Sequence, residues 1–113
     1  MNHKYREQQR FALGTPVPVL IHRQDKQGEN QAPVEGMLLD AGEQSMGIVV
    51  LEPLELTSLC IVEVCDEDAP EHFRGEVCYL ANTEYGVRLG ILLFDEGDMP
   101  FLDYLMCIGV RLK

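Results

Sequence analysis

The sequence predicts a mainly β domain, an antiparallel barrel of six short strands that ends in a short α-helix. Six segments rich in apolar and β-branched residues recur at regular spacing, and polar turn segments of hairpin length separate them. The last segment changes from a strand period to a helical one. A length of 113 residues, with 46% hydrophobic and 25% charged residues, is typical of one folded domain and excludes a disordered tail.

The first half of the chain predicts three strands. Residues 16–23 contain β-branched residues and two prolines near their start, which suits an edge strand. A polar stretch at 25–33, which includes glycine and asparagine, predicts a hairpin loop. Strands at 34–40 and 46–51 follow, separated by a turn at 41–45.

The second half predicts three more strands. Residues 59–65 are rich in apolar and β-branched residues, and the acidic stretch after them predicts a solvated turn. The strongest pair is 73–80 and 85–94, joined by a connector of hairpin length. In the first strand of this pair Val77 and Tyr79 alternate, which places both on one face.

A helix is predicted over residues 99–108. Asp98 suits the N-cap, and Pro100 suits the first turn, where its missing N–H costs nothing. Gly109 provides a C-terminal stop. One helical face carries an apolar stripe, which we expect to cover one end of the barrel: Phe101, Leu102, Leu105 and Ile108.

Charge divides the chain into a basic arm at residues 1–12 and a domain at residues 13–113. Nine basic and nineteen acidic residues give a net charge of −10, which argues against nucleic acid as a partner. Residues 1–34 carry a net charge of +2, whereas residues 35–103 carry −14. The basic groups of the arm either pair with carboxylates of the domain or bind an anionic ligand.

Targeting signals are not visible in the sequence. The first residues contain no apolar segment that would indicate a secretory signal, and the longest apolar stretches are too short to span a bilayer. We therefore expect a cytoplasmic protein without membrane insertion.

Cysteine and histidine spacing predicts no catalytic or metal site. The four cysteines form no Cys-x-x-Cys pair, and the three histidines have no metal-ligand spacing. We expect reduced, buried thiols, no cofactor, and a protein that is not an enzyme. The alternative, a nucleophilic cysteine paired with His72, has no local signature to support it.

Three features in order resemble a known family. They are an Arg-x-x-x-Arg element at Arg6 and Arg10, a strand that ends at Asp40, and the late strand pair around Arg74 and Tyr85. This order is similar to a PilZ domain, a bacterial six-stranded split barrel that binds cyclic di-GMP. The resemblance covers nearly the whole chain. It implies that the two arginines and the turn after Asp40 bind the ligand.

The second family motif, Asp/Asn-x-Ser-x-x-Gly, departs from its usual spacing here. Between Asp40 and Gly47 the chain has two residues more than the motif, and Ser45 is displaced. The expected ligand-binding residues are therefore Arg6, Arg10, Asp40, Ser45 and Gly47. Arginine suits both phosphate and guanine, and a carboxylate can accept hydrogen bonds from the guanine N–H groups.

The resemblance implies a signalling role. We expect a cyclic di-GMP receptor module, in which ligand binding orders the arm against the barrel and changes a surface read by an unidentified protein partner. The intact arginine pair favours this interpretation. The altered turn favours the alternative, a PilZ-like protein-interaction adaptor that has lost nucleotide binding.

Overall fold

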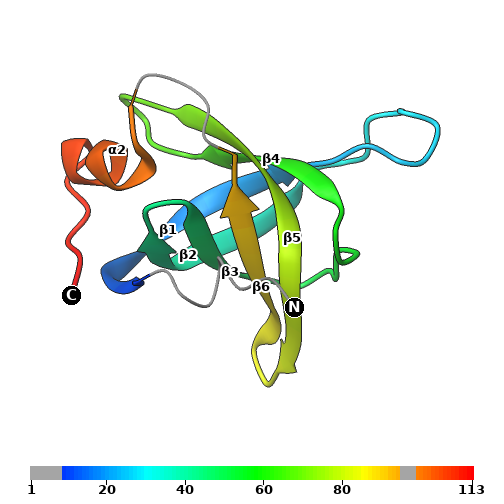
Figure 1. The fold of residues 1–113 in the computed structure, drawn as a ribbon, viewed down its shortest axis with the longest axis horizontal. Coiled ribbons are helices and arrows are strands. Elements are labelled where there is room, and N and C mark those ends of the chain that lie inside the picture. The colour runs from blue at the N-terminus through cyan, green and yellow to red at the C-terminus, as the bar shows by residue number, and fades with distance from the viewer. Residues whose placement is uncertain (1–8, 95–98) are drawn as a thin grey trace.

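The protein is described from a computed structural model, which covers residues 9–94 and 99–113 (Figure 1). The described residues form six strands and one helix. In chain order they are β1 (Phe11–His22), β2 (Val34–Gly42), β3 (Ser45–Val50), β4 (Leu59–Val64), β5 (Glu71–Thr83), β6 (Gly86–Leu93) and α2 (Phe101–Cys107). The predicted number and order of strands and the late helix are confirmed.

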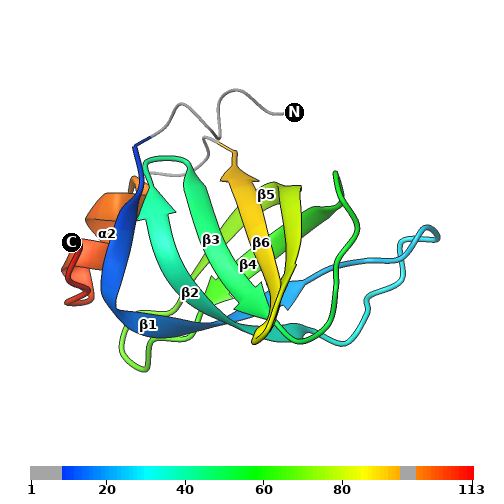
Figure 2. The ribbon, with the colours of Figure 1, turned by 90° about the horizontal axis from the view of Figure 1, so that it is seen from below.

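The strands form a closed antiparallel barrel with the order β1-β2-β3-β6-β5-β4 (Figures 1 and 2). Strands consecutive in the chain pair with each other except β3 and β4; β3 pairs with β6 instead, and β4 pairs with β1. The ring closes where β1 pairs with β4, from Val19 opposite Val64 to His22 opposite Ile61. Closure leaves no exposed sheet edge among the paired strands, which removes a common route to aggregation.

The core fills the barrel with the inward-facing residues of each strand. Strand alternation places one face of each strand inside, as the fully buried Leu38, Ile48, Leu89 and Ile91 show. Gly36 faces the same interior, and a methyl group there would overlap the side chains of Ile48 and Val50. Aliphatic and β-branched side chains therefore make up most of the core.

β1 begins at Phe11, five residues before the predicted start and inside the predicted arm. Phe11 and Ala12 already pair with β2, and a register shift then interrupts the ladder between Ala12 and Val17. This irregular stretch contains Gly14, Thr15 and Pro16, which have the composition of a turn. The early part of β1 was not predicted because the strand continues through this bulge.

The β5–β6 hairpin is longer and its turn tighter than predicted. β5 runs to Thr83 and β6 begins at Gly86, so the predicted connector at 81–84 is mostly strand. Thr83 Oγ1 donates a hydrogen bond to the carbonyl oxygen of Gly86 at 2.7 Å, and Gly86 has a φ of 133°. Glycine tolerates this backbone conformation, which allows the two-residue turn.

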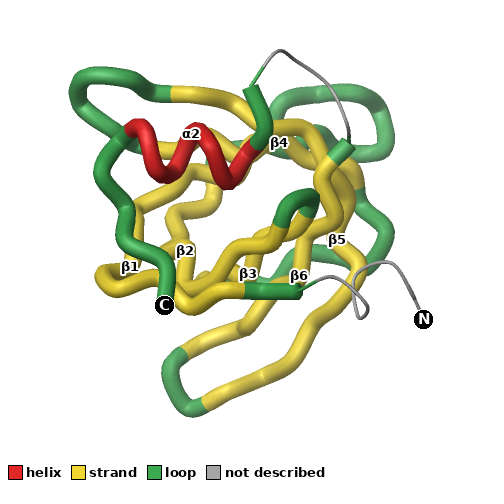
Figure 3. The backbone as a smooth tube through the Cα atoms, turned by 60° about the vertical axis from the view of Figure 1, so that its left-hand side comes forward, coloured by secondary structure: helices red, strands yellow, loops and turns green. Residues whose placement is uncertain are grey.

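Helix α2 packs across one end of the barrel (Figure 3). Its buried residues are Phe101, Tyr104 and Leu105, whereas Leu102 is only partly buried. Phe101 meets the ring of Phe73 edge to face, with ring centroids 5.0 Å apart. The Tyr104 hydroxyl donates a hydrogen bond to the carbonyl oxygen of Ala69 at 2.6 Å, so the helix also fastens the loop before β5.

The start of the helix differs from the prediction. Pro100 occupies the N-cap position and makes no side-chain capping hydrogen bond, so it precedes the helix rather than lying in its first turn. Asp98, the predicted N-cap, lies outside the described residues. Gly109 follows the helix with a φ of 86°, which agrees with its predicted role as a stop signal.

The four cysteines are free thiols in different environments. Cys60 is buried, as predicted, whereas Cys65 and Cys78 are partly buried and Cys107 is exposed. The expectation of four buried thiols is therefore wrong for Cys107, which is the last residue of α2 and does not contribute to its buried face. Burial raises the pKa of the Cys60 thiol from 9.0 to about 12.

This contrast predicts selective thiol labelling. At pH 8 a thiol with a pKa near 12 is ionised in only about one molecule in ten thousand, and the thiolate is the reactive form. We expect iodoacetamide to modify the exposed Cys107 in the folded protein and Cys60 only after unfolding, as measured by peptide mass spectrometry. Equal labelling of Cys60 in folded and unfolded protein would contradict the buried position. Cys107→Ser provides the control for labelling at the helix.

Among the described residues, no helix has the length and apolar character needed to cross a membrane.

Candidate functional site

Asp40 lies on the outer wall of the barrel because a β-bulge reverses the direction of its side chain. Leu38 pairs with Ile48 and Asp40 with Gly47, so Leu39 is the extra residue. Leu38 and Ala41 both point into the core. Without the bulge, alternation would send the Asp40 carboxylate into the core.

Two arginines converge on the Asp40 carboxylate. Arg10 Nη1 lies 3.7 Å from Oδ1, and Arg88 Nη2 donates a hydrogen bond to Oδ2. The Asp40 side chain is only 16% exposed, so solvent screens these contacts incompletely. Two guanidinium groups and one carboxylate leave one net positive charge on a protein whose net charge is −10. The cluster therefore concentrates basic groups at one point of an otherwise acidic protein.

Oδ1 of Asp40 keeps an unused acceptor position. It is buried, and among the described residues no donor makes a hydrogen bond to it, since the contact with Arg10 is an ion pair at 3.7 Å. A buried acceptor without a hydrogen bond is costly, so a ligand N–H group that reached Oδ1 after the covering groups moved would be favoured.

A strip without side chains runs from Asp40 across the neighbouring strands. Gly47 pairs with Asp40 on one side and with Gly90 on the other, and Gly90 pairs with Tyr79. A methyl group on Gly47 would overlap the Asp40 carboxylate in its present position, so the carboxylate lies directly over this glycine. Gly47 and Gly90 are both buried beneath neighbouring side chains. The strands that form the strip, β2, β3, β6 and β5, lie in sequence along one wall in Figure 2.

Tyr79 stands at the far end of this strip, also because of a bulge. Val77 pairs with Ile91 and Tyr79 with Gly90, so Cys78 is the extra residue in β5. Val77 is fully buried, whereas Tyr79 is 46% exposed. The prediction that both share one face is therefore wrong, because the bulge turns Tyr79 outward. At about 4.8 Å per strand, the tyrosine lies roughly 14 Å from Asp40 along the sheet.

Cys78, the bulged residue, has a thiol that is influenced by burial and by the charge of Arg10. Burial raises the pKa of its thiol, and the positive charge of Arg10 is among the influences that oppose this shift. The thiol donates to the carbonyl oxygen of Gly90 at 3.4 Å. The thiol of Cys78 thus lies near enough to Arg10 for its charge to have a small effect. We name the site formed by these residues the Asp40 face: Arg10, Asp40, Gly47, Tyr79, Arg88 and Gly90.

The lengthened turn between Asp40 and Gly47 is a regular hairpin. Gly42 pairs with Ser45, and Glu43 and Gln44 form a two-residue turn. The two additional residues extend the hairpin by one pair and leave Asp40 directly opposite Gly47. Ser45 is fully buried, and its hydroxyl has no hydrogen-bond partner among the described residues. The turn therefore preserves the Asp40–Gly47 pair and encloses the serine.

Of the five expected site residues, the structure brings three together: Arg10, Asp40 and Gly47. Ser45 is buried at the end of the hairpin, and Arg6 lies outside the described residues. Sequence analysis missed Tyr79, Arg88 and Gly90 as members of this site. In the sequence Tyr79 is simply a tyrosine in a strand, and Arg88 and Gly90 form an Arg-x-Gly sequence. Both features are common in β proteins and do not indicate a site.

Comparison with known proteins finds a similar backbone fold but no similar sequence. No protein-family model matches the sequence, and no curated protein matches it. The chain is similar to the solved structure of the PilZ domain with c-di-GMP of YcgR from Escherichia coli, with a TM-score of 0.59 and 14% identity. The match covers 80% of this chain and 78% of that chain. The protein has a PilZ-like fold.

The PilZ-like fold explains how the site residues meet. In this barrel Arg10 directly precedes β1, Asp40 lies near the end of β2, and Gly47 lies in the first half of β3. Because β1 pairs with β2 and β2 with β3, three residues distant in sequence become neighbours on one wall. The expected resemblance is thus confirmed at the level of the fold.

Proposed function

We propose that this protein is a cyclic di-GMP receptor module, a binding domain rather than an enzyme, and that the ligand binds on the Asp40 face. The observation that carries the proposal is the cross-strand pair of Asp40 and Gly47 beside Arg10, which persists although the turn is two residues longer than the family motif. The solved PilZ domain with the same fold is described with c-di-GMP.

The chemistry of the Asp40 face matches the parts of this ligand. The Arg10 guanidinium can bind phosphate oxygens through two parallel hydrogen bonds. The Asp40 carboxylate suits the N–H groups of a guanine edge, provided that the groups that bury Oδ1 move aside when the ligand binds. Tyr79 offers a partly exposed ring on which a base can stack.

Relay to a protein partner is part of the proposal. Arg10 directly precedes β1, so a ligand that binds Arg10 also contacts the segment that leads into the first strand. Ligand contacts at this position would favour one arrangement of that segment over others, and a cytoplasmic partner would bind the surface so formed.

The adaptor that has lost nucleotide binding is the second candidate function. Two observations favour it: Arg88 already occupies Oδ2 of Asp40, and Ser45 is buried rather than open to a ligand. The two functions differ in one measurable property, which is binding of cyclic di-GMP.

Isothermal titration calorimetry with cyclic di-GMP tests the proposal. We expect saturable binding to the wild-type chain and weaker binding of cyclic di-AMP, because adenine presents an amino group and no N1–H where guanine presents two donors. Asp40→Asn keeps the shape of the side chain but removes its charge. The loss of a charge-assisted hydrogen bond is expected to lower affinity for cyclic di-GMP by about tenfold, with a smaller change for cyclic di-AMP.

Asp103→Asn, on the exposed side of α2, is the matched control and should bind as the wild type does. Absence of binding at high micromolar cyclic di-GMP would overturn the receptor proposal and support the adaptor.

A further inference from the structure

A second cluster of polar side chains lies on the outer surface of β1, β4 and β5. His22 is the last residue of β1, Glu63 lies near the end of β4, and His72 is the second residue of β5. Glu63 pairs directly with His72, and His22 pairs with Ile61, two residues from Glu63. The neighbours Ile21, Val62 and Val64 are fully buried, so alternation directs the cluster outward.

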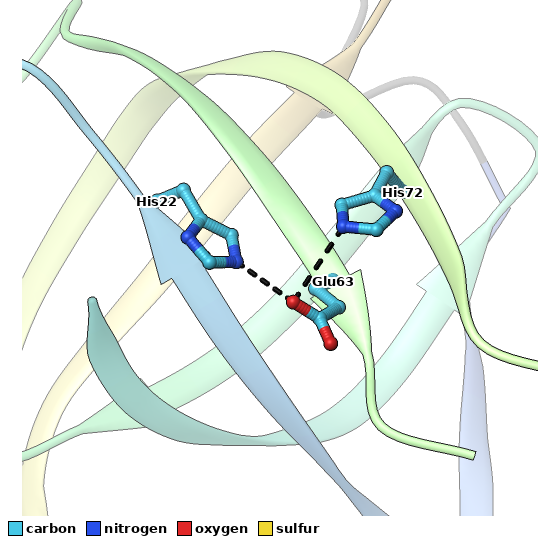
Figure 4. A group of neighbouring side chains, drawn as sticks. All are labelled: His22, Glu63 and His72. Carbon is cyan, nitrogen blue, oxygen red and sulfur yellow. Dashed lines mark hydrogen bonds and ion pairs between the residues drawn. The ribbon is translucent and has the colours of Figure 1, made fainter. Parts of the chain in front are cut away.

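The three side chains converge on one oxygen atom. Glu63 Oε1 lies 2.8 Å from Nε2 of His22 and 3.5 Å from Nε2 of His72 (Figure 4). The two imidazole rings are 6.1 Å apart between centroids and inclined by 34°. One donor atom from each residue lies within 4.8 Å of the others. All three side chains are partly exposed, so an ion in solution can reach them.

We propose that His22, Glu63 and His72 bind a divalent transition-metal ion, Zn²⁺, on the wall of the barrel. Two imidazole nitrogens and one carboxylate oxygen form a donor set that suits Zn²⁺, with a remaining position for water or a donor from a partner. Metal–ligand distances of about 2.0–2.1 Å place tetrahedral donor atoms roughly 3.3 Å apart. The carboxylate–imidazole distances of 2.8 and 3.5 Å lie on either side of this value.

The backbone favours a site with little rearrangement. Each donor comes from a strand of the closed barrel, and β4 pairs with both β1 and β5. Side chains on paired strands are held more rigidly than side chains on loops, so side-chain rotation suffices to admit the ion. Glu35 lies on the same outer face across β1, because Leu20 pairs with both Glu35 and Glu63. This second carboxylate adds to the negative potential that attracts a cation.

The site would join three strands at the closure of the barrel. β1 and β4 are the strands whose pairing completes the ring, and the ion would bridge them and connect both to β5. An ion that binds only the folded protein stabilises it by mass action. We expect the melting temperature to rise by roughly 10 °C when free Zn²⁺ reaches a hundredfold excess over its Kd.

The metal site and the Asp40 face are independent. In the ring of six strands β4, which carries Glu63, is opposite β3, which carries Gly47. The two sites share only β5, in which His72 and Tyr79 are seven residues apart, and they have no residue in common. Nucleotide binding can therefore fail while metal binding succeeds, and the reverse.

Calorimetric titration of the full chain with Zn²⁺ tests the site. We expect one ion per chain, and we expect His72→Ala and His22→Ala each to weaken binding by at least about tenfold. Glu63→Gln keeps the shape of the side chain but loses its charge, and should also weaken binding. Co²⁺, used as a spectroscopic substitute, should give the absorption bands of a site with imidazole and carboxylate ligands and no thiolate charge-transfer band.

Two control variants separate the cluster from other donors. His3→Ala removes the third histidine of the chain, and Cys107→Ser removes the exposed thiol; both should bind Zn²⁺ with wild-type affinity. The proposal is overturned if the wild type does not bind Zn²⁺, if His72→Ala binds it unchanged, or if Cys107→Ser abolishes binding. Circular dichroism of each variant verifies that the barrel is folded, and the conservative His72→Gln provides a second test at the most exposed donor.

Discussion

Replacement of Arg10 by alanine is expected to weaken cyclic di-GMP binding by about ten- to a hundredfold. Each guanidinium that binds phosphate makes charge-assisted hydrogen bonds worth roughly 1.5–3 kcal/mol, and 1.4 kcal/mol corresponds to a tenfold change in Kd. The structure places Arg10 beside Asp40, on an acidic protein where few other cations can substitute for it. Calorimetry on the purified full chain measures the change, and Arg6→Ala should have an effect of the same order.

Three further measurements serve as controls for the Arg10→Ala variant. Arg111→Ala removes an exposed arginine near the C-terminus and should leave affinity unchanged. Arg10→Lys keeps the charge but loses the planar, bidentate group, so it should recover only part of the affinity. Binding by wild type should also weaken as salt increases, because the contacts are ionic and partly exposed.

The stability of Arg10→Ala should change little, by about 0–1 kcal/mol, because a partly exposed ion pair contributes little to folding. Wild-type affinity in Arg10→Ala, measured beside a binding-competent wild type, would remove Arg10 from the site and with it the proposed role of the Asp40 face.

Replacement of Leu38 by alanine is expected to lower the free energy of unfolding by about 2–5 kcal/mol. Leu38 is fully buried in the barrel, and its removal costs both hydrophobic transfer energy and the energy of the cavity left behind. It also directly precedes the bulge that turns Asp40 outward, so the same residue anchors the candidate site to the core. Urea denaturation followed by circular dichroism measures the loss.

Leu51→Ala is the matched control for this substitution. Leu51 is 84% exposed, so the same change in chemistry should alter stability by no more than about 0.5 kcal/mol. Equal destabilisation by the two variants would show that Leu38 does not lie in the interior.

The six strands were predictable because alternation and turn composition act locally. Leu59 to Val64 was placed to within one residue, and the strand predicted at 34–40 starts where β2 starts. The early part of β1 was missed because its residues 14–16 have turn composition, yet pairing with β2 continues on both sides of them. Local propensity is a weak guide where neighbouring strands supply the pairing.

The candidate site was predictable in part. Arg10, Asp40 and Gly47 were identified from a motif, and the barrel brings them together. Tyr79 was assigned to the wrong face because alternation assumes an uninterrupted strand, and the bulge at Cys78 is not marked by glycine or proline. Arg88 was not identified, since its contact with Asp40 spans 48 residues.

Sequence alone determined the number of strands, their succession along the chain and the late helix, and it identified three residues of the candidate site, because periodicity, turn composition and motif spacing are local properties. Tertiary structure decided which residues share a face. Two bulges turn Asp40 and Tyr79 outward, and strand pairing brings together His22, Glu63 and His72, whose sequence separations match no metal motif. The physical reason is that register across strands is set by packing of the whole barrel, and a shift of one residue moves every following side chain to the opposite face.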